Sequence, residues 1–166
     1  YQNGKLTVAN LAIEDAKGQL YARGSLNAAG DANLNLTVTG FDLSELMFIQ
    51  APLALPALEG HANFEGKLEG NITSPRVSGS LEVVDGIIDE YNFEHLKAQL
   101  AGDVHKLEIT SGLVEVDSDK YSITGTFTNL GNPKTTCVDT KVNFEDVPLS
   151  KMRRLTKRQF PADGVC

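Results

Sequence analysis

Apolar and polar residues alternate with a period of two along most of the chain, and this alternation constrains the fold more than any other feature. A period of two puts the apolar residues on one face of a β-strand, whereas a helix requires a period of 3.6. The pattern predicts about a dozen strands of five to eight residues, and short turns such as Asp85-Gly86 indicate antiparallel neighbours. The alternating segments are Leu6 to Val8, Leu20 to Leu26, Ala32 to Val38, Ala62 to Phe64, Val77 to Val83, Leu96 to Leu100, Leu107 to Ile109, Val114 to Val116, Tyr121 to Phe127 and Val138 to Phe144.

The strands belong to a repeat with a spacing of 101 residues. Lys5-Leu6-Thr7-Val8 returns as Lys106-Leu107-Glu108-Ile109, and Leu20, Ala22, Gly24 and Leu26 return as Tyr121, Ile123, Gly125 and Phe127. Such a repeat describes a stacked β array whose function lies in one long face. We expect a partial unit at residues 1–56, a full unit at residues 57–160 and a tail at residues 161–166.

Two segments break the alternation and predict short helices. Residues 42–50 begin with an N-cap, either Asp42 or Ser44, and prolines follow the segment. Residues 148–160 begin with Pro148, which suits a first helical turn. The two segments occupy equivalent positions in the repeat, so each is expected beside the sheet, at one end of its apolar face.

The net charge of −7 argues against a nucleic-acid partner, because phosphate binding requires a basic surface. The charge is uneven, since residues 151–166 alone carry +4. This basic run fits two interpretations, a positive helix that contacts anionic lipid head groups or an acidic neighbour, and a solvated helix face.

The two cysteines, Cys137 and Cys166, lack the spacing of metal ligands and form no CxxC motif. A disulfide between them would tie the basic segment to the sheet, and an oxidising compartment would permit it. The sequence shows no signal peptide or membrane span, and Tyr1 opens directly on a strand pattern. We therefore expect a fragment of a longer array.

The residue types of an active site are present but scattered. His61, His95 and His105 lie far apart in polar strand phases or at turns, and no GxSxG motif occurs. The acidic pair Asp117 and Asp119 lacks calcium-loop spacing, which favours a solvated turn. The sequence predicts a protein that is not an enzyme and has neither a cofactor nor a metal.

One passage resembles a known family. Gly66-Lys67-Leu68-Glu69-Gly70, followed by Pro75-Arg76-Val77-Ser78-Gly79-Ser80-Leu81 and Gly86, is similar to the recurring "G-x-L-x-G... P-x-V-x-G-x-L-x-x-x-x-G" passage of the AsmA-like and TamB proteins of diderm bacteria. The resemblance covers most of the chain. It implies an all-β fold, an extended, curled antiparallel sheet (a β-groove, half-pipe or "β-taco") with one or two short helices.

The resemblance also implies a function. It implies a segment of a periplasmic protein of lipid transfer or outer-membrane biogenesis, which offers an apolar groove to phospholipid acyl chains between the inner and outer membranes. An outer-membrane β-barrel protein would be a partner, and an anchor in the inner membrane would lie outside this fragment.

The alternation predicts which residues line that groove, because residues of one parity share one concave side. The alternative is a closed β-sandwich that serves as a structural or adhesive surface module without lipid transport. The predicted lining residues are Leu6, Val8, Leu20, Leu34, Leu36, Val38, Phe64, Val77, Leu81, Val83, Leu96, Leu100, Leu107, Ile109, Ile123, Phe127, Val142 and Phe144.

Overall fold

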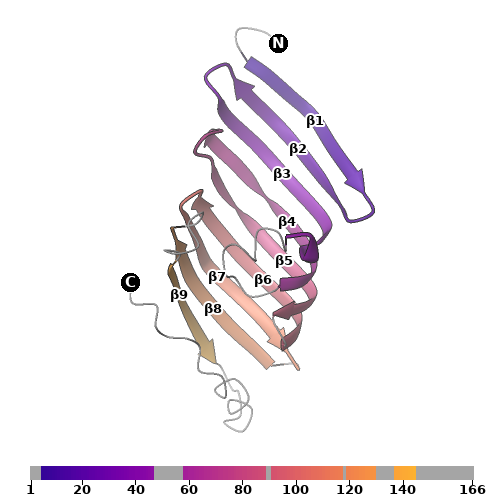
Figure 1. Ribbon diagram of the computed structural model, residues 1–166, viewed down its shortest axis with the longest axis vertical. Coiled ribbons are helices and arrows are strands. Elements are labelled where there is room, and N and C mark those ends of the chain that lie inside the picture. The colour runs from indigo at the N-terminus through magenta and orange to yellow at the C-terminus, as the bar shows by residue number, and fades with distance from the viewer. Residues whose placement is uncertain (1–4, 47–57, 89–90, 118, 130–136, 145–166) are drawn as a thin grey trace.

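One antiparallel sheet of nine strands, with the strands in chain order, contains nearly all of the described residues (Figure 1). The computed structural model describes residues 5–46, 58–88, 91–117, 119–129 and 137–144. Its elements are β1 Lys5–Asp15, β2 Gly18–Asn27, β3 Asp31–Asp42, the 3₁₀ helix η1 Leu43–Leu46, β4 Leu58–Asn71, β5 Arg76–Ile88, β6 Tyr91–Asp103, β7 Lys106–Val116, β8 Asp119–Thr128 and β9 Cys137–Phe144.

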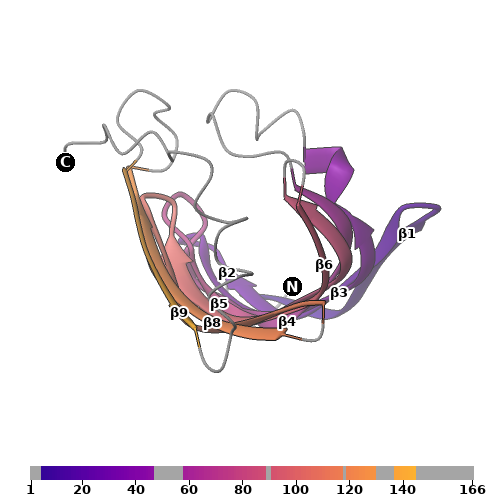
Figure 2. The ribbon, with the colours of Figure 1, turned by 90° about the horizontal axis from the view of Figure 1, so that it is seen from below.

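The sheet curls into an open trough. Figure 1 shows the strands stacked along the long axis, and Figure 2, viewed along that axis, shows their U-shaped cross-section. The sheet runs from β1 to β9 without closing on itself, so the described residues do not form a closed β-sandwich. The predicted fold class, an extended curled antiparallel sheet with little helix, is confirmed.

The predicted strand boundaries are wrong in one instructive place. The alternation predicts separate strands for Leu107 to Ile109 and for Val114 to Val116, but both segments belong to β7. A β-bulge between Ile109 and Gly112 inserts an extra residue into this strand, so the apolar parity changes in mid-strand. In the sequence, such a change of parity looks like the end of one strand and the beginning of another. Within the described residues, the strands are therefore fewer and longer than the alternation predicts.

The short helix η1 covers one end of the apolar face. Leu43 of η1 packs with Ala62, Val83 and Phe93 in the one cluster of buried apolar residues found in the described chain, and Val83 is fully buried. Figures 1 and 2 show η1 on the open side of the trough, at its rim. The face that carries Ala62 and Val83 is therefore the concave face.

The predicted helix at residues 42–50 is confirmed only over η1. Asp42 is its cap, because the Asp42 carboxylate accepts hydrogen bonds from the Ser44 amide at 3.0 Å and the Ser44 hydroxyl at 2.7 Å. Residues 47–50, the predicted helix at residues 148–160 and the basic run lie outside the described residues, as does the tail at residues 161–166. The predicted units at residues 1–56 and 57–160 stay a prediction; β3 pairs with β4, so the sheet is continuous between them.

Candidate functional site

The concave face is built from rows of residues that lie directly opposite one another on neighbouring strands. Three rows cross all nine strands, and every position in them is apolar or glycine except Thr140. The first row is Val8, Gly24, Leu34, Leu68, Val77, Gly102, Leu107, Phe127 and Val138; the second is Leu11, Ala22, Leu36, Gly66, Gly79, Leu100, Ile109, Gly125 and Thr140; the third is Ile13, Leu20, Val38, Phe64, Leu81, Ala98, Gly112, Ile123 and Val142.

The register puts all eighteen predicted lining residues on this one face. Fourteen of them stand in the three rows. Val83, Leu96 and Phe144 belong to a fourth row with Ala62, Val114 and Tyr121. Leu6 lies opposite Leu26 at the first end.

Most side chains of the concave face are only partly buried and remain accessible to solvent. Eight apolar residues are buried in the described chain, and four of them form the cluster at η1. Exposure rises toward the two ends of the trough, reaching 55% for Ile13 on β1 and 41% for Val142 on β9. Among the described residues this apolar surface is open along its length, which distinguishes it from a folded core, and exposed apolar surfaces of this extent are typical of sites that bind a ligand or a partner.

Glycines shape the floor of the trough. Gly66 and Gly79 lie opposite each other in the second row, and a Cβ atom on either would lie within 2.8 Å of the tip of the Phe64 ring. The ring therefore fills the space above both glycines, an arrangement known to support glycine in sheets. Phe93 covers Gly86 in the same way. The floor is thus lined by aromatic edges, and side chains at these glycines would displace the rings.

A set of polar contacts fixes η1 to the adjacent turn. The Lys17 side chain pairs with Glu45 of η1, and the Lys17 carbonyl accepts a hydrogen bond from the Asp42 amide at 3.0 Å. Hydrogen bonds from Ser44 lower the pKa of Asp42, first through its hydroxyl and then through its amide. These contacts hold the short helix over the rim, where Leu43 can reach the concave face.

The opposite face of the sheet is polar. His95 Nε2 lies 2.6 Å from Glu82 Oε1, and Lys97 Nζ lies 3.2 Å from the same oxygen. The hydrogen bonds from His95 and Lys97 lower the pKa of Glu82. Two shallow hollows of about 350 and 340 Å³ also lie on this face, lined by charges of both signs, Arg76 and Lys106 with Glu69 and Glu108 among them.

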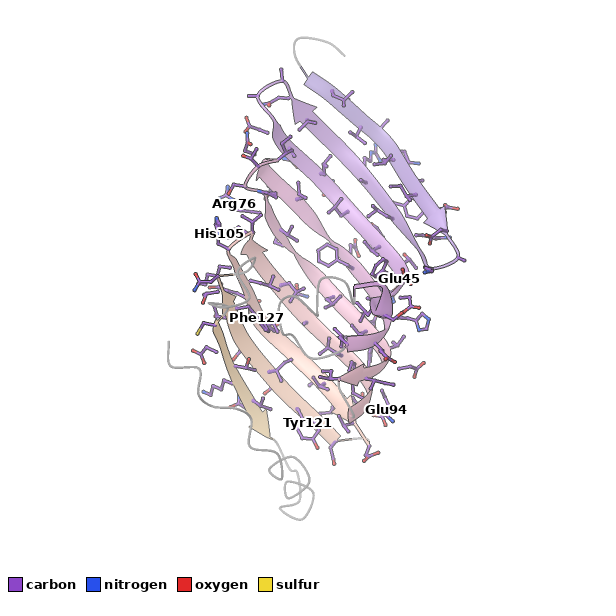
Figure 3. The ribbon with its side chains drawn as sticks, viewed as in Figure 1. Glu45, Arg76, Glu94, His105, Tyr121 and Phe127 are labelled. Atoms are coloured by element: carbon purple, nitrogen blue, oxygen red, sulfur yellow. The ribbon has the colours of Figure 1, made fainter. Side chains whose placement is uncertain are left out.

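The three histidines are not brought together. His95 pairs with Glu82, His105 lies in an exposed turn, and His61 sits opposite Val84 on the polar face. In the part of the chain that the structure describes, no three histidine, cysteine or acidic side chains gather in a metal-binding arrangement. Within the same residues, no helix has the length and apolar character needed to cross a membrane. Figure 3 shows Arg76 and His105 at one rim, Glu45 and Glu94 at the other, and Phe127 over the strands between them.

Cys137 opens β9 and is not a free thiol. Cys166 lies outside the described residues, so the predicted pairing of the two cysteines stays a prediction.

Several residues of the concave face were missed by the sequence reasoning. Leu11 and Ile13 follow the β1 bulge, between Val8 and Leu11, which shifts them out of the parity of Leu6 and Val8. Phe41 likewise follows a bulge in β3 and lies opposite Ala62. The 101-residue repeat could have identified Ile13, because Ile13 aligns with Val114, which the alternation places in a strand.

Comparisons with known proteins return nothing: the chain matches no family model, no curated protein and no solved structure.

Proposed function

We propose that the concave face is a conduit for the acyl chains of phospholipids, within a protein that moves lipid between the inner and outer membranes through the periplasm. The observation that carries the proposal is the set of three apolar rows, each crossing nine strands, on the face that the curled sheet leaves open. The resemblance of Gly66 to Gly86 to AsmA-like and TamB proteins supports the compartment and the lipid class.

The dimensions suit a conduit better than a pocket. Nine strands spaced at about 4.8 Å extend the trough by about 40 Å. One leaflet of a bilayer has an apolar thickness of about 15 Å, half of the hydrocarbon core. The trough is therefore longer than one acyl chain and would present a continuing apolar surface as the chain moves from strand to strand.

The energetics favour passage over retention. Each CH₂ group taken out of water contributes about 0.8 kcal/mol, so two acyl chains are strongly stabilised in the trough relative to water. Relative to a bilayer the gain is close to zero, because both surroundings are apolar. A head group would stay in solvent at the open side. Such a conduit needs no nucleophile, metal or cofactor, and it would select little between chains.

The test places a charge in the middle of the trough. Leu36 lies in the second row between Ala22 and Gly66, outside the buried cluster at η1, so Leu36→Asp perturbs the path more than the fold. The matched control is Thr37→Asp, which adds the same charge to the exposed polar face of the same strand. A charge facing hydrocarbon at the middle of a membrane barrel costs about 2 to 4 kcal/mol for Arg or Lys, and less for Asp.

Two measurements decide the outcome. Mass spectrometry of lipids retained by the purified chain should find phospholipid in the unaltered protein and in Thr37→Asp, and at least about tenfold less in Leu36→Asp, since about 1.4 kcal/mol corresponds to tenfold in binding. Crosslinking from a photoreactive residue at Leu34 should follow the same order. A chain purified without lipid, or equal lipid in both folded variants, would contradict the proposal and favour a structural or adhesive module.

A further inference from the structure

The trough has two rims, formed by opposite ends of the strands. The helix rim comprises residues 14–18, 41–45, 58–60, 92–94, 115–117 and 119–120, on the side of the sheet where η1 lies. The turn rim comprises residues 27–31, 71–76 and 103–106, which connect β2 to β3, β4 to β5 and β6 to β7. Figure 3 labels Glu45 and Glu94 at the helix rim, and Arg76 and His105 at the turn rim.

The two rims differ in charge among the described residues. The turn rim carries Arg76 and Lys106 against Asp31 and Asp103, together with His105. The helix rim carries two basic residues, Lys17 and Lys120, against the acidic residues Glu14, Asp15, Asp42, Glu45, Glu59, Glu94, Glu115, Asp117 and Asp119. Exposed charges separated by more than about 8 Å are largely screened at physiological ionic strength, so a phosphate group responds mainly to the rim beside it. The helix rim repels a phosphate group, and the turn rim does not.

The two carboxylates of the turn rim are engaged by hydrogen bonds near their own turns. Asp103 accepts hydrogen bonds from the amides of His105 and Lys106 at 2.8 and 3.0 Å. Asp31 accepts hydrogen bonds from two asparagine side chains at 2.8 and 3.3 Å. Arg76 is exposed, and its side chain has no ion-pair partner among the described residues. The turn rim therefore has a guanidinium that is available to an anion.

Exposed apolar side chains continue to the edge of the turn rim. Ile72 in the β4–β5 turn is 57% exposed, and Val104 in the β6–β7 turn is 43% exposed. The first apolar row lies next to these turns, since Val77 is the second residue of β5 and Leu107 is the second residue of β7. An acyl chain on the first row thus has apolar surface beside it as far as this edge.

The helix side of the trough is filled by the protein's own side chains. Ala62 and Val83 lie opposite each other in the fourth row, and they form the buried cluster with Leu43 of η1 and Phe93. Partly buried residues near the strand ends on this side pack against the same cluster, namely Leu58, Ile88 and Val116. From β4 to β7, packed side chains therefore separate the three open rows from the helix rim.

We propose that a phospholipid in the trough has one orientation, with its acyl chains on the three rows and its head group over the turn rim, beside Ile72, Val104 and the Arg76 guanidinium. A guanidinium forms paired hydrogen bonds with phosphate oxygens, so Arg76 suits the phosphodiester of the head group. The carboxylates of the helix rim exclude anionic head groups from the other side. The orientation rests on the proposed lipid function and adds to it the side of the trough on which the head group travels.

The experiment maps two photoreactive phospholipids on the unaltered chain. One is a phosphatidylethanolamine with a diazirine on its head-group amine, and the other carries the diazirine at the end of one acyl chain. Mass spectrometry should find the head-group probe on residues 71–76 and 103–106 at least about fivefold more often than on the helix rim, a ratio that corresponds to about 1 kcal/mol. The acyl-chain probe should be found on the three rows.

A charge reversal supplies the second measurement. Arg76→Glu should lower the amount of phosphatidylglycerol retained by the purified chain by about fivefold, because a phosphate would then meet a carboxylate at the turn rim. Lys67→Glu, which makes the same charge change at an exposed position of β4 away from both rims, is the matched control and should leave retention unchanged.

The outcomes separate the orientation from the lipid function. An acyl-chain probe on the three rows, with the head-group probe on the helix rim or equally on both rims, would overturn the orientation alone. Equal retention of phosphatidylglycerol by Arg76→Glu and Lys67→Glu would also contradict it. A chain that crosslinks to neither probe would overturn the proposed lipid function together with the orientation.

Discussion

Two hairpins of this sheet have the same register but different surroundings. In β1–β2 the residue before the bulge, Val8, lies opposite Gly24, and in β7–β8 the equivalent Ile109 lies opposite Gly125. The bulges fall at equivalent positions, 101 residues apart. The shared sequence pattern thus encodes the hairpin together with its irregularity, independently of the strands on either side.

Equivalent residues of the two hairpins differ in burial, although the hairpins share their register. Val114 of β7 packs against the buried cluster, whereas its equivalent in β1, Ile13, is 55% exposed. β7 has a neighbour on each side, and β1 has one among the described residues. In a stacked array each strand covers the next, so the stability of one unit depends on its neighbours. Four predictions test this division between local encoding and neighbour-dependent stability.

The largest effect is expected at the strand after the second hairpin. β9 has one neighbour among the described residues, whereas its counterpart after the first hairpin, β3, has two. If Cys137 pairs with Cys166, the disulfide constrains the unfolded chain and stabilises the fold by about 3 kcal/mol. Cys166→Ser should lower the free energy of unfolding by that amount. Denaturant unfolding with and without reductant measures the difference.

Two controls accompany the cysteine variant. A reductant should destabilise the unaltered chain and leave Cys166→Ser unchanged. A count of two free thiols in the unfolded, unreduced protein would rule out the bond directly.

The next effect concerns the equivalent glycines of the two hairpins. Gly24 has a φ of +154°, and a Cβ atom there would lie 2.0 Å from the carbonyl oxygen of Asn33. At Gly125 the nearest atom would be 3.1 Å away, and φ is not in the positive region. Gly24→Ala should therefore destabilise the protein by about 2 kcal/mol and Gly125→Ala by less than about 1 kcal/mol. Equal effects in denaturant unfolding would show that the two backbones are alike.

A smaller effect distinguishes the equivalent apolar positions. Val114→Ala removes a contact with the buried cluster and should cost about 1 kcal/mol. Ile13→Ala removes more atoms from a more exposed position and should cost less than about 0.5 kcal/mol. Thermal unfolding measures both variants. A larger loss at Ile13 would mean that β1 is covered in the isolated chain.

The sequence predicts the face of the sheet better than its strand boundaries. Period two alone assigned Leu36, Phe64 and Leu100 to one side, because a strand without bulges keeps its parity. The alternation does not predict the side of Ile13 and Phe41, because each follows a bulge. A bulge depends on hydrogen bonding between strands and is not marked by a particular residue type. The open curl was implied by the family resemblance and by the glycines. The packing of Phe64 over the glycines of the second row is a contact between strands, which alternation within one strand does not specify.

The smallest predicted effect is a pH dependence at the turn of the first hairpin. Asp42 contacts this turn through its amide, and its carboxylate caps η1; the second hairpin turn is held instead by the Glu94 carboxylate, which accepts a hydrogen bond from the Asp117 amide at 3.1 Å. Ser44 lowers the pKa of Asp42 below its ordinary value of 3.8. A carboxyl whose pKa is lower in the folded state stabilises the fold above its unfolded pKa, and this stabilisation is lost as pH falls through the folded pKa.

Asp42→Asn retains a capping oxygen but cannot titrate. It should be slightly less stable than the unaltered chain at about pH 7 and equally stable once the pH is below the folded pKa of Asp42. Denaturant unfolding across this range measures the convergence, and Glu94→Gln serves as the matched variant at the other turn. If Asp42→Asn keeps the full acid dependence of the unaltered chain, the capping carboxylate makes no contribution, and η1 is held over the trough by the packing of Leu43 and by the Lys17 contacts.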